Sequence, residues 1–164
     1  MNRQGSGWLA VVFALWALTP GCDCGPIDPV EPVWEPTPYA LEIPPFFPPM
    51  DIPEDNLLTE EGVQLGRMLF WETRLSETNT MSCGTCHLPE HSFSDPNPYS
   101  TGVTGAVGNR NAMALINMGW ATSFFWDGRA FTLEEQILDP IPHPDEMNLP
   151  WSEAVDRLQN DAES

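Results

Sequence analysis

The sequence predicts a mostly α domain of short helices and long loops, preceded by a signal peptide and a proline-rich tether. The 164 residues include 18 prolines and 12 glycines, a content that argues against long uninterrupted helices. No convincing alternation of apolar and polar residues indicates a strand. Helix-capping patterns recur after Asp55. A chain of this length predicts one modest domain with a limited core.

Residues 1–22 predict an export leader. Arg3 is the only charge before an apolar run from Trp8 to Leu18, which is long enough for a signal-peptide core and short for a membrane span. The run ends near Cys22, in a pattern that resembles a bacterial lipoprotein cleavage site, although a leucine lies one place early and the proline is unusual. We expect a periplasmic protein with a lipid anchor on Cys22. The alternative is an ordinary secretory leader, with Cys22 and Cys24 free or paired.

Residues 23–54 predict a proline-rich, acidic linker. Proline fixes φ and removes a hydrogen-bond donor, so the segment is expected to form an extended tether. Its aromatic residues could instead wrap the surface of the domain; they are Trp34, Tyr39, Phe46 and Phe47. The folded domain is expected over residues 55–164.

Capping signals predict the helices of this domain in chain order. Thr59 precedes two glutamates, which the helix dipole favours in a first turn. Thr132 and Glu135 form a capping-box pattern, and Ser152 is the expected cap of the last helix. The expected helices cover residues 59–71, 82–87, 110–117, 132–138 and 152–160.

The string Cys83-Gly84-Thr85-Cys86-His87 carries the most specific chemistry. The two cysteines lie on one side of a helical turn, so their thiols can add to the two vinyl groups of one porphyrin while His87 binds the iron. Zinc would need two further ligands, for which His91 and another histidine could nominally serve. A redox dithiol would need a βαβ setting, and a disulfide is the remaining alternative. Export and the adjacent histidine favour one covalent haem c.

The haem motif does not by itself separate an electron carrier from a catalyst. A carrier closes the sixth iron position with Met or His, whereas an oxidising enzyme keeps it open beside a proton-handling group. The formal net charge of −18, with six arginines and no lysine, makes nucleic acid a poor partner. It favours a basic electron-donor protein, although an acidic, solvated surface without a chosen partner explains it equally well.

Several strings in this order resemble the N-terminal domain of the bacterial di-haem cytochrome c peroxidases. They are Leu-Gly-Arg at 65–67, Arg-Leu-Ser at 74–76, Ser-Cys through His at 82–87, Gly-Asn-Arg-Asn at 108–111, Phe-Trp-Asp-Gly-Arg-Ala at 125–130, Leu-Glu-Glu-Gln at 133–136 and Glu-Met at 146–147. The resemblance covers residues from about 55 to the end of the chain. It implies a cytochrome c-like haem domain that reduces hydrogen peroxide to water with electrons from a small c-type cytochrome.

The resemblance also implies roles for individual residues. Glu146 falls at the distal acid–base carboxylate, which moves a proton as the peroxide bond breaks, and Gln136 falls at a distal-pocket amide. Trp126 falls at an electron-relaying tryptophan between two haems, and Asn111 at a ligand of a calcium ion. From the residues alone, Glu146 could be a surface acid and Gln136 a polar residue on an exposed helix face. Trp126 could be a core aromatic and Asn111 a local helix cap. Arg110 and Arg129 are expected to pair with haem propionates or with a nearby aspartate.

Two departures from the family pattern shape the expectation. Val103 stands where the best-known members have a histidine that blocks the resting haem, so we expect five-coordinate or water-bound iron. Other routes to the iron remain for His91, His143, Met113 and Met118. The second haem motif and the C-terminal domain are missing, which favours a second haem domain in trans, a separate cytochrome partner or a truncated gene product. The further alternatives are a mono-haem electron-transfer protein and a haem protein that oxidises a protein side chain.

Overall fold

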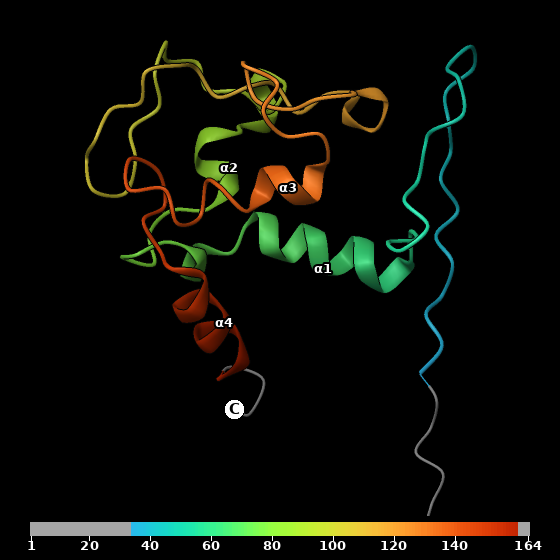
Figure 1. The fold of residues 1–164 in the computed structure, drawn as a ribbon, viewed down its shortest axis with the longest axis horizontal. Helices are drawn as coiled ribbons and strands as arrows, with labels where there is room; N and C mark the ends of the chain where they lie inside the picture. Colours follow the sequence, from blue (N-terminus) through green and yellow to red (C-terminus); the bar gives the residue numbers. More distant parts are fainter. Residues whose placement is uncertain (1–33, 161–164) are drawn as a thin grey trace, which may run out of the picture. The chain divides into compact units, whose positions relative to one another are not determined.

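The computed structural model describes residues 34–160 (Figure 1). The chain divides into two compact units, Met1–Glu35 and Pro36–Ser164. Only Trp34 and Glu35 of the first unit are described, so the fold considered below is that of the second. The predicted leader, its Cys22 and the first part of the predicted tether lie outside the described residues.

Short helices joined by long loops make up the described chain. The elements are α1 (Glu60–Phe70), η1 (Thr73–Leu75), α2 (Cys83–Cys86), η2 (Pro89–His91), η3 (Met118–Trp120), α3 (Leu133–Ile137) and α4 (Trp151–Gln159), where η marks a 3-10 helix. Within residues 34–160 strand pairing is limited to isolated bridges, such as Leu88 with Ser94. The prediction of short helices and long loops without a sheet is confirmed for this part of the chain, but loops occupy more of it than helices do. In the same range, no helix is long and apolar enough to cross a membrane.

Two helix starts follow the predicted capping chemistry. The Thr59 hydroxyl accepts the backbone N–H of Gly62 at 3.0 Å and begins α1. The Thr132 hydroxyl accepts the backbone N–H of Glu135 at 3.0 Å and begins α3. The Glu135 carboxylate accepts the backbone N–H of Phe131 at 2.8 Å. In a capping box it would accept the N–H of the cap residue itself, Thr132. Local side-chain chemistry therefore sets both starts.

Two other helix predictions are wrong. Residues 110–117 form no helix, because the Asn111 side chain binds an earlier loop and Asn117 adopts a left-handed conformation with φ 55°. Ser152 is not a cap, since α4 begins at Trp151 after Pro150, which has φ −57° and ψ 140°. The Trp151 indole donates to the carbonyl of Leu138 at 3.1 Å, and this long-range bond holds the start of α4.

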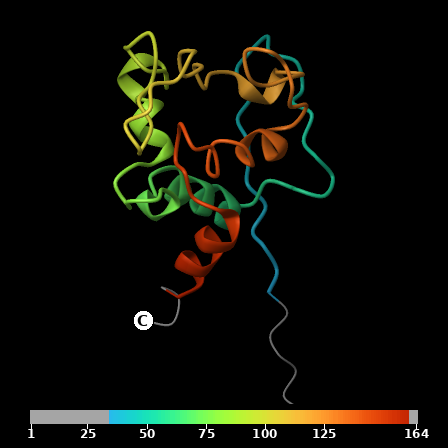
Figure 2. The same ribbon diagram turned by 60° about the vertical axis from the view of Figure 1, so that its left-hand side comes forward.

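Residues 37–50 of the predicted tether lie against the domain. The backbone N–H and the hydroxyl of Thr37 donate to the Glu61 carboxylate at 3.0 and 2.9 Å. Further along, the Trp120 indole donates to the carbonyl of Pro48 at 2.9 Å and packs on Phe47, with ring centroids 4.8 Å apart. Figures 1 and 2 show this segment in teal beside the rest of the domain. Of the aromatic residues in the predicted tether, Phe47 therefore packs on the domain surface, whereas Trp34 and Phe46 are exposed.

The best-packed part of the domain joins α4 to η1 and the loop before α4. Its core cluster comprises Leu75, Ile141, Met147, Leu149 and Ala154, with Leu69, Trp151 and Leu158 packed against it. In contrast, α1 and α3 contain no buried residue, and hydrophobic side chains such as Leu65 and Ile137 are exposed. Apart from Leu69, the apolar side chains of α1 and α3 therefore lie outside the packed core.

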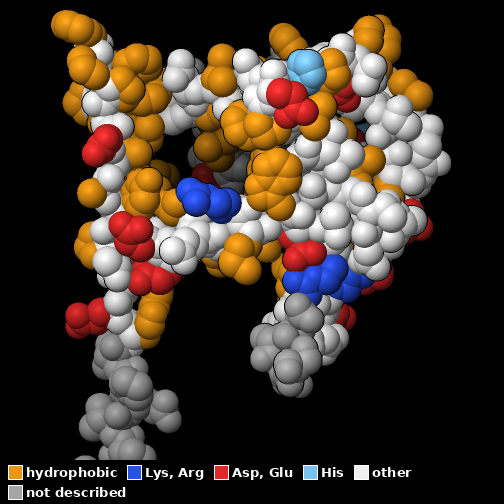
Figure 3. Space-filling model, turned by 180° about the vertical axis from the view of Figure 1, so that it is seen from behind, with side chains coloured by type: hydrophobic (Ala, Val, Ile, Leu, Met, Phe, Trp, Pro, Cys, Tyr) orange, Lys and Arg blue, Asp and Glu red, His pale blue; other side chains and the backbone are white. Residues whose placement is uncertain are grey.

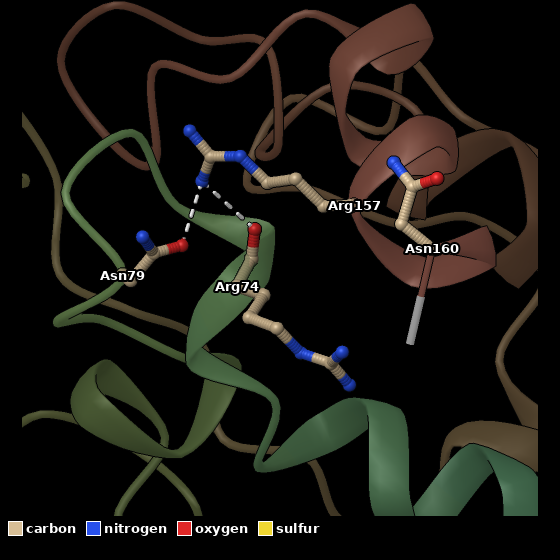
Figure 4. Close-up of a pocket in the computed structure, with 4 residues that line it drawn as sticks. All are labelled: Arg74, Asn79, Arg157 and Asn160. Atoms are coloured by element: carbon tan, nitrogen blue, oxygen red, sulfur yellow. Dashed lines mark hydrogen bonds between the residues drawn. The ribbon is translucent and has the colours of Figure 1, made fainter. Parts of the chain in front are cut away.

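Arg157 links α4 to residues 74–79. Its guanidinium group donates to the carbonyl oxygens of Arg74 at 3.1 Å, Ser76 at 2.7 Å and Glu77 at 3.1 Å. It also donates to Asn79 Oδ1 at 2.8 Å (Figure 4) and pairs with Glu153 at 2.6 Å. These bonds form one side of an open pocket of about 380 Å³. Because one cation satisfies several loop carbonyls, α4 is fastened by hydrogen bonds as well as by apolar packing.

Candidate haem-binding site

The two cysteines of the motif lie on α2. The Thr85 hydroxyl accepts the backbone N–H of Ser82 at 3.0 Å and fixes the first turn. Cys83 and Cys86 are half-buried free thiols, so the disulfide alternative finds no support. Burial raises the pKa of both thiols, and for Cys86 a hydrogen bond with Ser100 acts against that rise. Within the described residues no cluster of three or more His, Cys, Asp or Glu side chains could hold a metal ion, so zinc finds no support either.

His87 ends α2 and is oriented by a backbone carbonyl. Its Nδ1 atom lies 2.9 Å from the carbonyl oxygen of Phe93. A carbonyl only accepts, so Nδ1 carries the proton and Nε2 keeps its lone pair for a metal. The loop returns toward α2 because the N–H of Phe93 donates to Leu88 at 2.8 Å, with Ser92 and Phe93 at φ 58° and 56°. This is the hydrogen bond that metal-binding histidines usually make through the second ring nitrogen.

An apolar pocket of about 410 Å³ adjoins the motif. Its lining residues are Arg67, Phe70, Trp71, Phe93 and Leu115. The Trp71 indole lies directly on the backbone of Gly84, between the two cysteines, where a Cβ atom would overlap the ring. Figure 3 shows a hollow in one face of the molecule with hydrophobic side chains and an arginine at its edge. Aromatic walls and one cation fit a flat apolar ring that carries carboxylates, so the residues fit a haem.

Arg67 is a functional candidate that the sequence interpretation missed. Among residues 34–160 the other arginines pair with carboxylates, whereas no ion pair of Arg67 is found there; the paired arginines are Arg74, Arg110, Arg129 and Arg157. The signal was available, because Phe70 and Trp71 follow Arg67 by three and four residues and share its side of α1.

Glu146 lies within electrostatic reach of the motif. Its side chain is exposed, but protein atoms crowd its carboxyl group, and this desolvation raises its pKa. Asp139 adds to the rise, while the charges of His143, Arg129 and His87 oppose it. The Glu146 charge in turn raises the pKa of Cys86. The predicted acid–base carboxylate therefore feels the charge of the predicted iron ligand.

Trp126 and Asn111 contact each other. The Trp126 indole, 62% exposed, donates to the backbone carbonyl of Asn111 at 2.8 Å, so the side chain is no core aromatic. The Asn111 amide nitrogen donates to the carbonyls of Asp95 and Asn97 at 2.9 and 2.6 Å, and its Oδ1 accepts from Ser94 at 2.9 Å. These bonds make Asn111 a brace between loops. Calcium binding by Asn111 stays a prediction.

The remaining predicted residues lie around this centre. Arg110 and Arg129 pair with Asp127 at 3.3 and 3.0 Å, which favours the aspartate alternative over the haem propionates. Arg129 also pairs with Asp139 and lies over the Phe125 ring. Gln136 is half-buried on α3, and in the described part of the chain no hydrogen bond joins its side chain to the Cys83–His87 motif. The proposed role of Gln136 is therefore not supported by a contact.

Comparisons with known proteins show which family the chain belongs to. Residues 60–164 match the family model of the di-haem cytochrome c peroxidases. The methylamine utilization protein MauG of Methylorubrum extorquens is 43% identical over 113 residues, 65% of this chain and 30% of that protein. The cytochrome c peroxidase Ccp of Escherichia coli is 37% identical over 115 residues, 70% of this chain and 25% of that protein.

A solved structure extends the likeness to the fold. A MauG-like protein associated with microbial copper homeostasis superposes with a TM-score of 0.70 at 39% identity, over 76% of this chain and 37% of that chain. The present chain therefore spans between a quarter and two fifths of the length of these relatives. The family model covers well over half of the chain, and the chain therefore belongs to the di-haem cytochrome c peroxidase family.

Proposed function

We propose that this domain binds one covalent haem c through Cys83, Cys86 and His87 and reduces hydrogen peroxide to water with electrons from a small c-type cytochrome. The observation that carries the proposal is the position of Glu146, whose backbone is bonded to the loop at Val103 and whose desolvated carboxyl group feels the charge of His87 and raises the pKa of Cys86. Several relatives are named as cytochrome c peroxidases, which supports the same chemistry.

The bound haem would supply an iron centre that takes up peroxide and delivers electrons to it. Around it, the Glu146 carboxylate takes a proton from one peroxide oxygen and returns it to the other, for which a raised pKa is an advantage. The Phe93 carbonyl holds the Nδ1 proton of His87, which directs Nε2 toward the iron. Arg67 receives a carboxylate of the porphyrin, and Gln136 keeps the distal-pocket role that the family resemblance implies.

Electrons enter through an exposed part of the domain in this proposal. Trp126 offers an exposed indole whose orientation is fixed by its bond to Asn111, which suits a relay. The donor is a small cytochrome or a second haem domain acting in trans. The formal net charge of −18 suits a basic donor, and added salt is expected to slow the reaction. The location is the periplasm, with Cys22 as a lipid anchor and a calcium ion near Asn111 as further parts of the proposal.

The decisive experiment compares wild type with Glu146→Gln in peroxide-dependent oxidation of reduced cytochrome c. We expect a loss of roughly 100- to 10,000-fold in kcat, the usual contribution of a positioned acid–base group. Asp145→Asn is the matched control, because it removes the neighbouring carboxylate, which is exposed. Equal rates in wild type and Glu146→Gln would remove Glu146 from the mechanism.

A mono-haem electron-transfer protein, or an inactive peroxidase fragment, is the second candidate. The exposed and oriented indole of Trp126 suits electron exchange without turnover equally well. A low-spin, six-coordinate ferric spectrum together with no peroxide consumption would select this candidate over the first.

A further inference from the structure

The Ser100–Val107 loop is closed on itself by backbone hydrogen bonds. Thr101 and Val107 form an antiparallel bridge, and the N–H of Gly102 donates to Ala106 at 2.8 Å. The turn between them uses Gly105 at φ 84°, a conformation that glycine adopts without strain. The loop is therefore a small preformed unit rather than a loose connection.

One side of this loop lies against the backbone that carries Glu146. The N–H of Val103 donates to the carbonyl of Glu146 at 2.7 Å, and the Thr104 hydroxyl donates to Pro144 at 3.3 Å. Gly102 is buried against the peptide between Asp145 and Glu146, where a Cβ atom would overlap the Asp145 carbonyl. Gly102 does not adopt a left-handed φ, so close approach alone explains the need for glycine.

The start of the loop is tied to the haem-attachment motif. The Ser100 hydroxyl donates to the Asp95 carboxylate at 2.8 Å and also acts on the Cys86 thiol, where it opposes the rise in the pKa. Ser100 and Val103 are three residues apart, and between them the loop connects an attachment cysteine to Glu146. A displacement of the loop would thus change the position of Glu146 relative to the haem.

We propose that Gly102 and Val103 are positioning residues, and that their loop fixes the Glu146 carboxyl group relative to the haem attached at Cys86. The proposal rests on the proposed function only where activity is the readout. Misplacement of a catalytic group by about 1 Å costs on the order of 100-fold in rate, so a loop that sets this distance controls turnover.

The test is a double-mutant cycle on the haem-loaded protein, with Gly102→Ala, Glu146→Gln and the combined variant. Gly102→Ala is expected to lower kcat roughly 10- to 100-fold with an unchanged KM for the cytochrome. In the Glu146→Gln background the same change is expected to cost nothing further, because the loop acts through that carboxyl group. An equal loss in both backgrounds would overturn the proposal.

Fluoride binding to the ferric haem gives a readout that does not need turnover. A protonated Glu146 donates a hydrogen bond to the bound anion, so Gly102→Ala should weaken fluoride binding, and it should have no further effect once Glu146→Leu has removed the donor. Unchanged fluoride affinity in Gly102→Ala would also overturn the proposal. A wild type that binds fluoride in this way but reduces no peroxide would refute the proposed function and leave the positioning role standing.

Two further variants separate positioning from general damage. Gly66→Ala adds a methyl group on α1 where nothing lies within 4 Å, and it should leave haem loading, kcat and fluoride affinity unchanged. If Gly102→Ala does not load haem, Thr104→Val replaces it, because this change removes the hydrogen bond to Pro144 without added volume. The double-mutant cycle is then run with Thr104→Val and Glu146→Gln, and a smaller loss of kcat is expected. Additive losses of kcat would again contradict the proposal.

Discussion

The Nδ1 atom of His87 lies 2.9 Å from the carbonyl oxygen of Phe93, so the backbone rather than a side chain fixes the predicted iron ligand. This bond selects the tautomer in which Nε2 is free. The Phe93 ring has a separate task, since it lines the apolar pocket and meets Phe70 at a centroid distance of 6.0 Å. One residue thus orients the histidine through its main chain and shapes the cavity through its side chain.

Phe93→Ala should separate these two tasks. The carbonyl remains, so we expect an unchanged iron–histidine stretching frequency in the resonance Raman spectrum of the ferrous protein. The free energy of unfolding should fall by roughly 1–3 kcal/mol, less than for a fully buried phenylalanine. Denaturant unfolding measures that loss. A shifted iron–histidine frequency would mean that the ring, and not the carbonyl alone, holds the loop in place.

Arg129→Gln should move the acid limb of the peroxidase pH profile to higher pH. The Arg129 charge lowers the pKa of Glu146, so its removal raises that pKa, and a base that works deprotonated then needs a higher pH. The measurement is kcat/KM against pH. Arg110→Gln is the matched control, because Arg110 also pairs with Asp127 but is not among the charges that act on Glu146. Equal shifts in both variants would contradict the explanation.

Gly84→Ala should destabilise the haem-loaded protein by about 1–3 kcal/mol, as overpacking usually does. The added methyl group would overlap the Trp71 indole that lies on the turn between the two cysteines. Gly66→Ala, in open space on α1, should instead stabilise by about 0.5–1 kcal/mol. Guanidinium unfolding followed by circular dichroism compares the two. Similar midpoints for both variants would show that Trp71 moves aside without cost.

Glu72→Gln should remove a part of the acid sensitivity of folding. Hydrogen bonds from Arg74 lower the pKa of Glu72 from 4.5 to about 2, so this carboxylate stabilises the folded state fully above the unfolded pKa. The stabilisation is lost as the pH falls from 4.5 toward 2. Wild type should therefore lose about 1 kcal/mol more than the variant across this window, as expected for a surface pair. Parallel curves of unfolding free energy against pH would refute the assignment.

The sequence predicted the elements whose causes are local. The Thr59 and Thr132 caps and the turn that carries Cys83 and Cys86 depend on residues within one helical turn of each other, and the structure has all three. The predicted helix from Arg110 to Asn117 failed because Asn111 bonds to residues 14 and 16 positions earlier. Such partners are not visible in a local pattern.

In the candidate site, too, the parts with local causes were predictable and the parts that depend on distant segments were not. The motif from Cys83 to His87 is local, whereas the place of Glu146 depends on the approach of Gly102 to a segment more than 40 residues later. The family resemblance predicted Glu146, but the glycine that allows its approach became evident only from packing. The lack of an ion pair for Arg67 among residues 34–160 likewise became evident only from the structure. Pairing between distant segments is set by the whole fold, so it could not be predicted from periodicity or capping.

The hydrogen bonds of Arg157 belong to a part of the domain that packs without the haem. The cluster around Ile141 and Leu149, together with this guanidinium, unites α4 with η1 using polypeptide contacts alone, whereas α1 bounds the pocket that the prosthetic group would complete. The packing of α4 on η1 thus does not depend on the haem, whereas the packing around α2 is completed by it. Loss of the pigment should then loosen this domain locally rather than unravel it throughout.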